Sequence, residues 1–344
     1  MENKTVLAGL FPEELSGLLA SYPLFRCRQL HKWVLSGAGS FGEMTSLPVP
    51  MRNELEEKFR IYPGGVVKEQ KDPDGTIKLG ISLEDGAVIE SVILSDGENR
   101  KTACLSTQAG CPMGCVFCKT GMLGFGRNLT SAEIAAQYLL LMRREPGISN
   151  IVIMGMGEPL YNLEALRKAL AYFMDPGGPG ISRRRITIST CGLEEGIRDL
   201  ADNGPEVRLA LSLTSARQEL RECLMPVSRS HPLRLIKESL LYFQKKTEQR
   251  ITLEMALLAG INTNPAEADA VSEFVRGLDA VINLIPWNRV DGLNFNGSAL
   301  KSPPANEIAA FVSALKHRGV KVTRRYGKGS GISAACGQLG SNNK

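Results

Sequence analysis

KTACLSTQAGCPMGCVFCKTG, residues 101–121, carries three cysteines at the spacing C-x3-C-x2-C. The stretch begins as an apolar strand, TACLST, and continues as a glycine-containing loop that holds Cys111, Cys115 and Cys118. A segment with helical spacing of apolar residues follows at 131–144. Three soft thiolates this close together can surround one compact metal centre. The stretch therefore predicts a metal site on a loop between a strand and a helix.

Strand-like and helical segments alternate from this stretch onward. The strand-like runs are TACLST, NIVIMGM, RITIST, VRLALSL, ITLEMALL and AVINLIP, and the helical segments lie at 131–144, 162–174, 193–203, 232–246, 265–277 and 304–317. This alternation predicts a parallel sheet with right-handed crossovers. Six units are too few for a closed eight-stranded barrel, so we expect an α/β fold with an open, partial barrel. Ligands of such sheets bind at the carboxyl ends of the strands.

Two smaller modules precede the barrel. Residues 1–62 contain three segments with helical spacing, FPEELSGLLAS, FRCRQLHKWVLSG and MRNELEEKF. In the second segment, we expect the basic side chains and His31 on a solvated face and Trp33 in the core. Residues 63–100 contain strand-like runs separated by Asp-Gly turns, which are a strong hairpin signal. We therefore expect a helical domain, then a β extension, then the barrel at 101–344.

Composition limits the classes of function. The chain has 344 residues, of which 43% are hydrophobic, which is enough to bury a large core. A net charge of +5 permits a nucleic-acid partner without requiring one. No run of 18 apolar residues and no secretory pattern is found, so neither a membrane span nor export is expected. Eight unevenly spread cysteines fit a reducing, cytoplasmic location.

The cysteine loop favours an iron–sulfur cluster with one open iron. Four-iron clusters normally take four cysteines, but this loop offers three. The open iron could bind the amino and carboxylate groups of S-adenosylmethionine, and an electron would then break the adjacent carbon–sulfur bond. Zinc is an alternative if Cys104 completes a four-thiolate site. A thioredoxin-like pair of Cys115 and Cys118 is another, but it leaves Cys111 unexplained.

Small and polar residues stand at the strand ends, where a cofactor would bind. Glycine lets the backbone approach a ligand closely, and a carboxylate could bind the methionine ammonium group. Hydroxyls and an amide could contact ribose or adenine. Each residue taken alone also fits ordinary turn or cap chemistry, so both interpretations stay open. The candidate cofactor contacts are Gly157, Glu158, Ser189, Ser212, Leu213, Thr214 and Asn288.

Three further residues are candidates for chemistry. Cys336 lies in a glycine-rich segment after the basic run KVTRRYGK, and this setting is expected to lower its pKa. Its alternative is a free thiol at the edge of the protein. Cys104 lies inside the first predicted barrel strand, TACLST, and is either reactive or a small buried apolar residue. Glu90, within AVIESVIL, is predicted to be a buried carboxylate suited to proton transfer.

The chain resembles the radical S-adenosylmethionine methyltransferases that modify adenines of RNA, the RlmN/Cfr type. The similarity rests on FRCRQLHKW, CLSTQAGCPMGCVFCKTG, GMGEPLYN, INLIPWN and AACGQLG, which occur in the family's order. It implies a partial (β/α)6 radical-SAM barrel with an N-terminal RNA-recognition domain. It also implies a [4Fe-4S] cluster on the three loop cysteines and two S-adenosylmethionine molecules per turnover. The implied partners are 23S rRNA, tRNA and an electron donor of the flavodoxin or ferredoxin type, and a monomer is expected.

The resemblance also implies roles for residues outside the cluster loop. The thiol matching Cys336 is methylated first, and a 5′-deoxyadenosyl radical then takes a hydrogen from that methyl group. The resulting methylene radical adds to an adenine carbon. The position matching Glu90 acts in proton transfer, and the one matching Cys104 resolves the adduct through a disulfide with Cys336. Thr214 stands where the family usually has His, which places the hydrogen bond of that position in question.

Three functions remain to be separated. The first is methylation of adenine C2 in the peptidyl-transferase centre of 23S rRNA and beside the tRNA anticodon, towards which the flanking motifs lean. The second is methylation of C8 of the same rRNA adenine, as in the Cfr branch. The third is an RNA-binding assembly factor whose metal site is structural.

Overall fold

One large mixed sheet organises the molecule. The computed structural model describes residues 4–96, 100–325 and 327–340. In sheet order, the strands in this part are β16 (Val322–Arg324), β13 (Ala280–Pro286), β12 (Ile251–Leu257), β11 (Arg208–Ser212), β10 (Ile186–Thr190), β9 (Ile148–Ile153), β6 (Lys101–Cys104), β5 (Val88–Ser95), β4 (Ile77–Leu83) and β3 (Gly64–Lys71). The strands from β6 to β16 run parallel, while β3, β4 and β5 form an antiparallel extension. The predicted α/β fold with an open barrel is confirmed.

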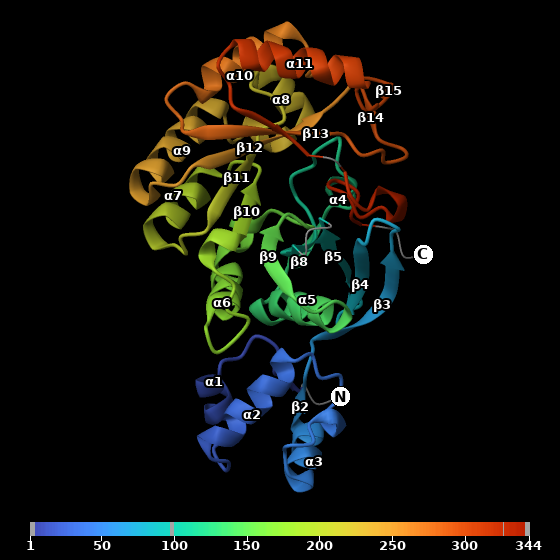
Figure 1. The fold of residues 1–344 in the computed structure, drawn as a ribbon, viewed down its shortest axis with the longest axis vertical. Coiled ribbons are helices and arrows are strands. Elements are labelled where there is room, and N and C mark those ends of the chain that lie inside the picture. Colours follow the sequence, from blue (N-terminus) through green and yellow to red (C-terminus); the bar gives the residue numbers. More distant parts are fainter. Residues whose placement is uncertain (1–3, 97–99, 326, 341–344) are drawn as a thin grey trace.

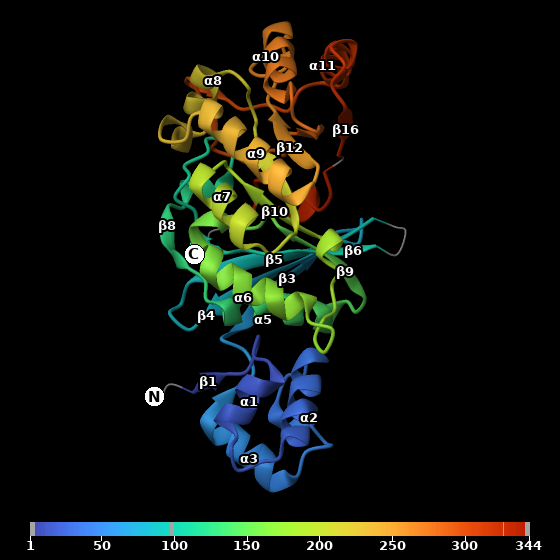
Figure 2. The same ribbon diagram turned by 90° about the vertical axis from the view of Figure 1, so that its left-hand side faces the viewer.

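Helices cover the outer face of the curved parallel sheet (Figures 1 and 2). They are α5 (Ser131–Arg144), α6 (Leu163–Met174), α7 (Glu194–Asn203), α9 (Leu233–Thr247), α10 (Pro265–Val275) and α11 (Ala305–His317). Each begins and ends within two residues of its predicted bounds. At the start of α5, the sequence signal that fixes the helix end is visible in the structure. Thr130 and Glu133 form a capping box, in which each side chain accepts a hydrogen bond from the other residue's backbone N–H. None of the helices in the described ranges is both long and apolar enough to cross a membrane.

The sequence pattern did not predict several short elements. They are β16, the helices α4 (Lys119–Met122) and α8 (Gln218–Leu224), and the antiparallel pair β7 (Gln108–Gly110) and β8 (Phe125–Asn128). The edge strand β16 pairs with β13 but spans only three residues of a basic run. Such short strands show no clear alternation of apolar residues, so periodicity does not detect them.

The N-terminal helices form a group at one end of the molecule (Figure 1). They are α1 (Pro12–Leu18), α2 (Leu24–Leu35) and α3 (Val49–Lys58), and a two-residue pairing of β1 (Thr5–Val6) with β2 (Phe59–Arg60) joins both ends of the group. The solvated position expected for His31 is wrong, since its ring is buried and lies edge-on to Tyr172 of α6, with the ring centroids 6.0 Å apart. The boundaries at residues 62 and 100 stay a prediction.

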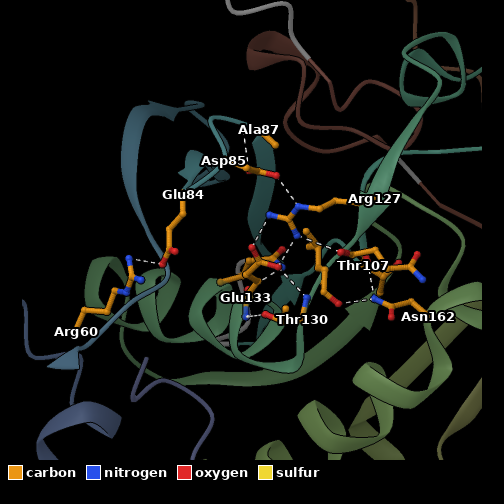
Figure 3. Close-up of polar contacts among 12 residues, drawn as sticks. Arg60, Glu84, Asp85, Ala87, Thr107, Arg127, Thr130, Glu133 and Asn162 are labelled. Carbon is orange, nitrogen blue, oxygen red and sulfur yellow. Dashed lines mark hydrogen bonds and ion pairs between the residues drawn. The ribbon is translucent and has the colours of Figure 1, made fainter. Parts of the chain in front are cut away.

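A partly exposed arginine network fastens the β extension to the barrel (Figure 3). Arg127 of β8 donates to both carboxylate oxygens of Glu133, at 2.8 and 2.7 Å, and its Nε donates to Asp85 at 2.6 Å. Asp85 lies at the hairpin tip between β4 and β5, and Glu133 lies in the first turn of α5. One guanidinium therefore ties the hairpin to the segment that follows the cysteine loop.

Candidate active site

The three loop cysteines face a common cavity of about 170 Å³. Their loop, residues 111–118, begins directly after β7. Gly110 has φ +81°, and a Cβ there would lie 2.0 Å from the carbonyl oxygen of Gly124, so the turn into the loop requires glycine. Cys111 N–H donates to the same Gly124 carbonyl at 2.8 Å. Cys111, Cys115 and Cys118 thus line one cavity at the carboxyl ends of the barrel strands.

The charges of these thiols fit a metal cluster. Burial raises the pKa of Cys111 to about 12, and the neighbouring thiols Cys115 and Cys118 add to the effect. Burial also raises the pKa of Cys118. Three adjacent thiolates repel one another unless positive charge lies among them, and iron supplies that charge. The donor set therefore fits the [4Fe-4S] cluster that a radical-SAM enzyme carries.

Glu158 and Gly157 form the next wall of the cavity. The Glu158 carboxylate is buried and accepts the N–H groups of Cys191 at 2.7 Å and Leu160 at 3.1 Å. Burial raises its pKa despite these bonds. Gly157 has φ +100°, and a Cβ there would lie 2.5 Å from the side chain of Gln108. A glycine and a fixed carboxylate at this strand end suit an ammonium group of a bound ligand.

Hydroxyl groups line the cavity at the ends of β10 and β11. The hydroxyl oxygens of Ser189 and Ser212 lie 3.3 Å apart. Thr214 has φ +56°, which is rare for a β-branched residue and is typical of strained functional sites. Asn262 holds this conformation by donating to the Thr214 carbonyl at 2.8 Å. Leu213 differs from the others because its side chain is fully buried and it is not among the residues that line the cavity.

Three residues of this site were not predicted from the sequence. Cys191 lines the cavity, and its backbone N–H is held by Glu158. Glu254 lines the cavity and accepts from Asn283 at 2.8 Å; a charged residue inside the apolar run ITLEMALL was a signal for it. Arg221 is completely buried and donates to the carbonyls of Cys191 at 2.6 Å and Leu213 at 3.1 Å. No local pattern marks Arg221.

A second cavity of about 280 Å³ adjoins the first. Its lining includes Cys104 and four basic residues. Because Cys104 does not line the cavity of the loop cysteines, the alternative of a four-thiolate zinc site lacks its fourth ligand. The basic lining residues are Arg100, Arg324, Arg325 and Lys328. The residues that line both cavities are Met154, Ile285, Asn288 and Cys336. Cys336 therefore stands between the cysteine-lined cavity and the basic cavity.

The segment that carries Cys336 is tied to the cysteine loop. We call residues 333–340 the thiol loop. Asn288 Nδ2 donates to the Cys336 carbonyl at 3.1 Å. The carbonyl of Gly337 accepts from Lys119 N–H at 2.7 Å, and the Thr120 hydroxyl donates to the Leu339 carbonyl at 2.7 Å. The segment that directly follows Cys118 thus fixes the position of the thiol loop.

The pKa expected for Cys336 is wrong in direction. Cys336 is exposed as a residue, but desolvation of its sulfur within the cavity walls raises the pKa of the thiol; Arg325 opposes this shift and Glu254 adds to it. Of the described basic residues in the run KVTRRYGK, only Arg325 lowers the pKa of this thiol, and its effect is smaller than that of desolvation. Burial also raises the pKa of Cys104 to about 12, with Cys336 contributing. Both cysteines are free thiols in this structure.

Glu90 lies beneath the thiol loop. It is 3% exposed, which matches the buried position expected for it. Its Oε1 lies 3.1 Å from Nζ of Lys78, and its Oε2 accepts Gly340 N–H at 2.6 Å. Glu90 is not one of the described residues that line the two cavities. Its role in proton transfer stays a prediction.

Comparisons with known proteins agree with this geometry. Residues 105–270 match the Radical SAM superfamily model. The "Probable dual-specificity RNA methyltransferase RlmN" of Treponema denticola is 48% identical over 338 residues, covering 98% of this chain and 96% of that protein. The protein of the same name from Moorella thermoacetica is 43% identical over 352 residues, covering 98% of each. A crystal structure of a radical SAM methyltransferase from Sphaerobacter thermophilus matches with a TM-score of 0.92 and 36% identity, covering 98% of this chain and 100% of that one.

The family inferred from the sequence motifs is therefore confirmed by nearly full-length matches and by the fold. The chain belongs to the RlmN family of radical S-adenosylmethionine RNA methyltransferases.

Proposed function

We propose that this enzyme methylates C2 of one adenine in the peptidyl-transferase centre of 23S rRNA, and C2 of an adenine beside the tRNA anticodon, through an S-methylated Cys336. The observation that carries the proposal is that Cys336 lines both cavities. A thiol in this position can take a methyl group on one side and deliver it on the other. The relatives' name, which includes dual specificity, supports two classes of RNA substrate.

The cofactor side begins with S-adenosylmethionine in the cysteine-lined cavity. When bound to Cys111, Cys115 and Cys118, the cluster supplies the electron that cleaves S-adenosylmethionine to a 5′-deoxyadenosyl radical. The other residues named above would hold the cofactor at the strand ends, through backbone atoms, hydroxyls and amides. These residues are Gly157, Glu158, Ser189, Ser212, Leu213, Thr214 and Asn288.

Cys336 carries the methyl group in two stages. In the first, its thiol loses a proton and attacks the sulfonium methyl group; a sulfur–carbon bond forms, and S-adenosylhomocysteine leaves with the electrons of the broken bond. In the second, the 5′-deoxyadenosyl radical takes a hydrogen atom from the S-methyl group, giving 5′-deoxyadenosine, and the methylene carbon bonds to adenine C2. The adduct gives up one electron, for which the oxidised cluster would be the acceptor, and Glu90 accepts the proton from C2. The Cys104 thiolate then attacks the Cys336 sulfur; the electrons of the broken carbon–sulfur bond go to the methylene carbon, which takes up a proton to become the new methyl group, and a disulfide remains.

The RNA side is the basic cavity. Arginine and lysine side chains beside Cys104 would bind phosphates that flank the target adenine. Residues 1–62 would recognise the RNA, residues 63–100 carry Glu90, and residues 101–344 form the barrel. We further propose that the enzyme acts as a cytoplasmic monomer and takes its electrons from a flavodoxin or a ferredoxin.

The test uses the full chain with its cluster reconstituted under anaerobic conditions, S-adenosylmethionine, a reductant and a 23S rRNA fragment. Cys104→Ala should accumulate a covalent protein–RNA adduct, whereas Cys223→Ala, which removes an exposed cysteine, should not. Mass spectrometry against C2 and C8 standards identifies the product. Formation of 8-methyladenine would replace the C2 proposal with the Cfr-type alternative. If no 5′-deoxyadenosine forms, the structural-metal alternative gains support.

A further inference from the structure

A buried ion pair lies beneath the thiol loop. Lys78 of β4 and Glu90 of β5 approach to 3.1 Å, and their side chains are 2% and 4% exposed. In the antiparallel register, Glu90 lies opposite Gly80, so Lys78 is its diagonal neighbour on the same face. Gly80 adds no side chain between them. Breaking such a pair on one side leaves a buried charge without compensation.

The same two charged groups hold both ends of the thiol loop. Lys78 Nζ donates to the Ser333 carbonyl at 3.0 Å, and the Gly340 N–H donates to Glu90 at 2.6 Å. Cys336 lies between these two anchors. Ser333 has φ +53°, a left-handed conformation that is uncommon for residues other than glycine. The ammonium group of Lys78 is in place to hold this conformation.

We propose that Lys78 is a positioning residue with two linked effects. It anchors the start of the thiol loop, so that Cys336 stays between the two cavities. It also holds the Glu90 carboxylate in place through the buried ion pair, in which each charge compensates the other. The second effect rests on the proposed function, in which Glu90 accepts the proton from adenine C2. Lys78 itself contacts neither cavity.

Lys78→Met removes the charge at nearly constant length, and Lys78→Arg keeps it. Lys68→Met, at an exposed lysine of the neighbouring strand β3, is the matched control. Hydrogen-exchange mass spectrometry of the full chain should show the amides of residues 333–340 exchanging about tenfold faster in Lys78→Met. Lys78→Arg and Lys68→Met should exchange like the wild type. If the exchange of residues 333–340 in Lys78→Met equals that of the control, the anchor does not exist.

A second readout separates the chemistry from the anchoring. With RNA and reductant, Lys78→Met should accumulate the uncleaved protein–RNA adduct, as Glu90→Gln should, and Lys78→Arg should clear it. If Lys78→Met does not fold, Glu90→Gln serves in its place, because it breaks the same ion pair without changing the size of the side chain. The amides of residues 333–340 must then exchange faster in Glu90→Gln, as expected for Lys78→Met. Normal exchange in Glu90→Gln overturns the proposal. If the wild type never methylates Cys336, the proposed function fails, while the exchange result still decides on the anchor.

Discussion

The loop of the cluster cysteines and the thiol loop meet at one cavity but are positioned by different kinds of interaction. In residues 111–118, three cysteines lie within eight consecutive residues. Local turns such as the Cys118 N–H to Cys115 carbonyl bond shape the chain, although Val116 N–H also donates to the distant Leu224 carbonyl. In residues 333–340, the anchors come from β4, β5, α4 and the end of β13. Short-range spacing thus groups the three loop cysteines, whereas long-range packing decides where the Cys336 thiol stands.

The largest effect should come from the locally encoded loop. Cys115→Ala removes one of the three proposed cluster ligands, so cluster iron should fall to background and 5′-deoxyadenosine formation should fall by more than about a thousandfold. Iron and sulfide analysis with product quantification measures both. Cys223→Ala, at an exposed thiol, should keep the full iron content. A Cys115→Ala protein that retains its iron would remove Cys115 from the ligand set.

The thiol loop should respond to pH. Because the pKa of Cys336 is raised above its ordinary value of 9.0, the thiolate fraction is small at neutral pH and grows as pH rises. The initial rate of Cys336 methylation should therefore increase about hundredfold between about pH 7 and pH 9, without a plateau. Isotope-labelled S-adenosylmethionine and peptide mass spectrometry measure it, with Cys336→Ser as the blank. A rate that is flat across this range would mean that thiol deprotonation does not limit the step.

Glu158 tests the cofactor side of the shared cavity. Glu158→Gln keeps the size but turns an amide donor towards one of the two N–H groups that the carboxylate accepts. The substitution also removes the negative charge opposite the proposed ammonium group, and a hydrogen bond to a charged group is worth about 1.5–3 kcal/mol, so the Kd for S-adenosylmethionine should rise about 10- to 150-fold. Equilibrium dialysis of the reconstituted protein measures it. An unchanged Kd would place the methionine ammonium group elsewhere.

The smallest effect on catalysis should come from Arg127, whose network lies outside both cavities. Arg127→Met leaves the Glu133 carboxylate, which is 6% exposed, without its counter-charge. Breaking this partly exposed pair should cost about 2–3 kcal/mol of stability, while activity at low temperature changes by less than about threefold. Thermal unfolding measures it. Arg234→Met, at an exposed i,i+4 pair, should cost less than about 0.5 kcal/mol, and equal losses in both variants would contradict the network's importance.

The sequence predicted the elements that have a long, regular pattern. The six barrel strands and their covering helices lie where apolar periodicity placed them. The edge strand β16 was missed because three residues carry no period. Glu254 could have been predicted, because it is a charged residue within an apolar run. Arg221 could not, because the carbonyls that it contacts belong to Cys191 and Leu213, which no local sequence pattern connects to it.

The sequence alone determined the order of strands and helices, and the spacing that brings Cys111, Cys115 and Cys118 to one cavity. Both follow from distances of a few residues, which the backbone geometry of strands, helices and turns fixes. Only the tertiary structure decided that Cys336 stands between the two cavities and that Lys78 and Glu90 anchor its loop. Such contacts join residues more than two hundred positions apart. They depend on how the whole sheet packs, and local spacing carries no information about them.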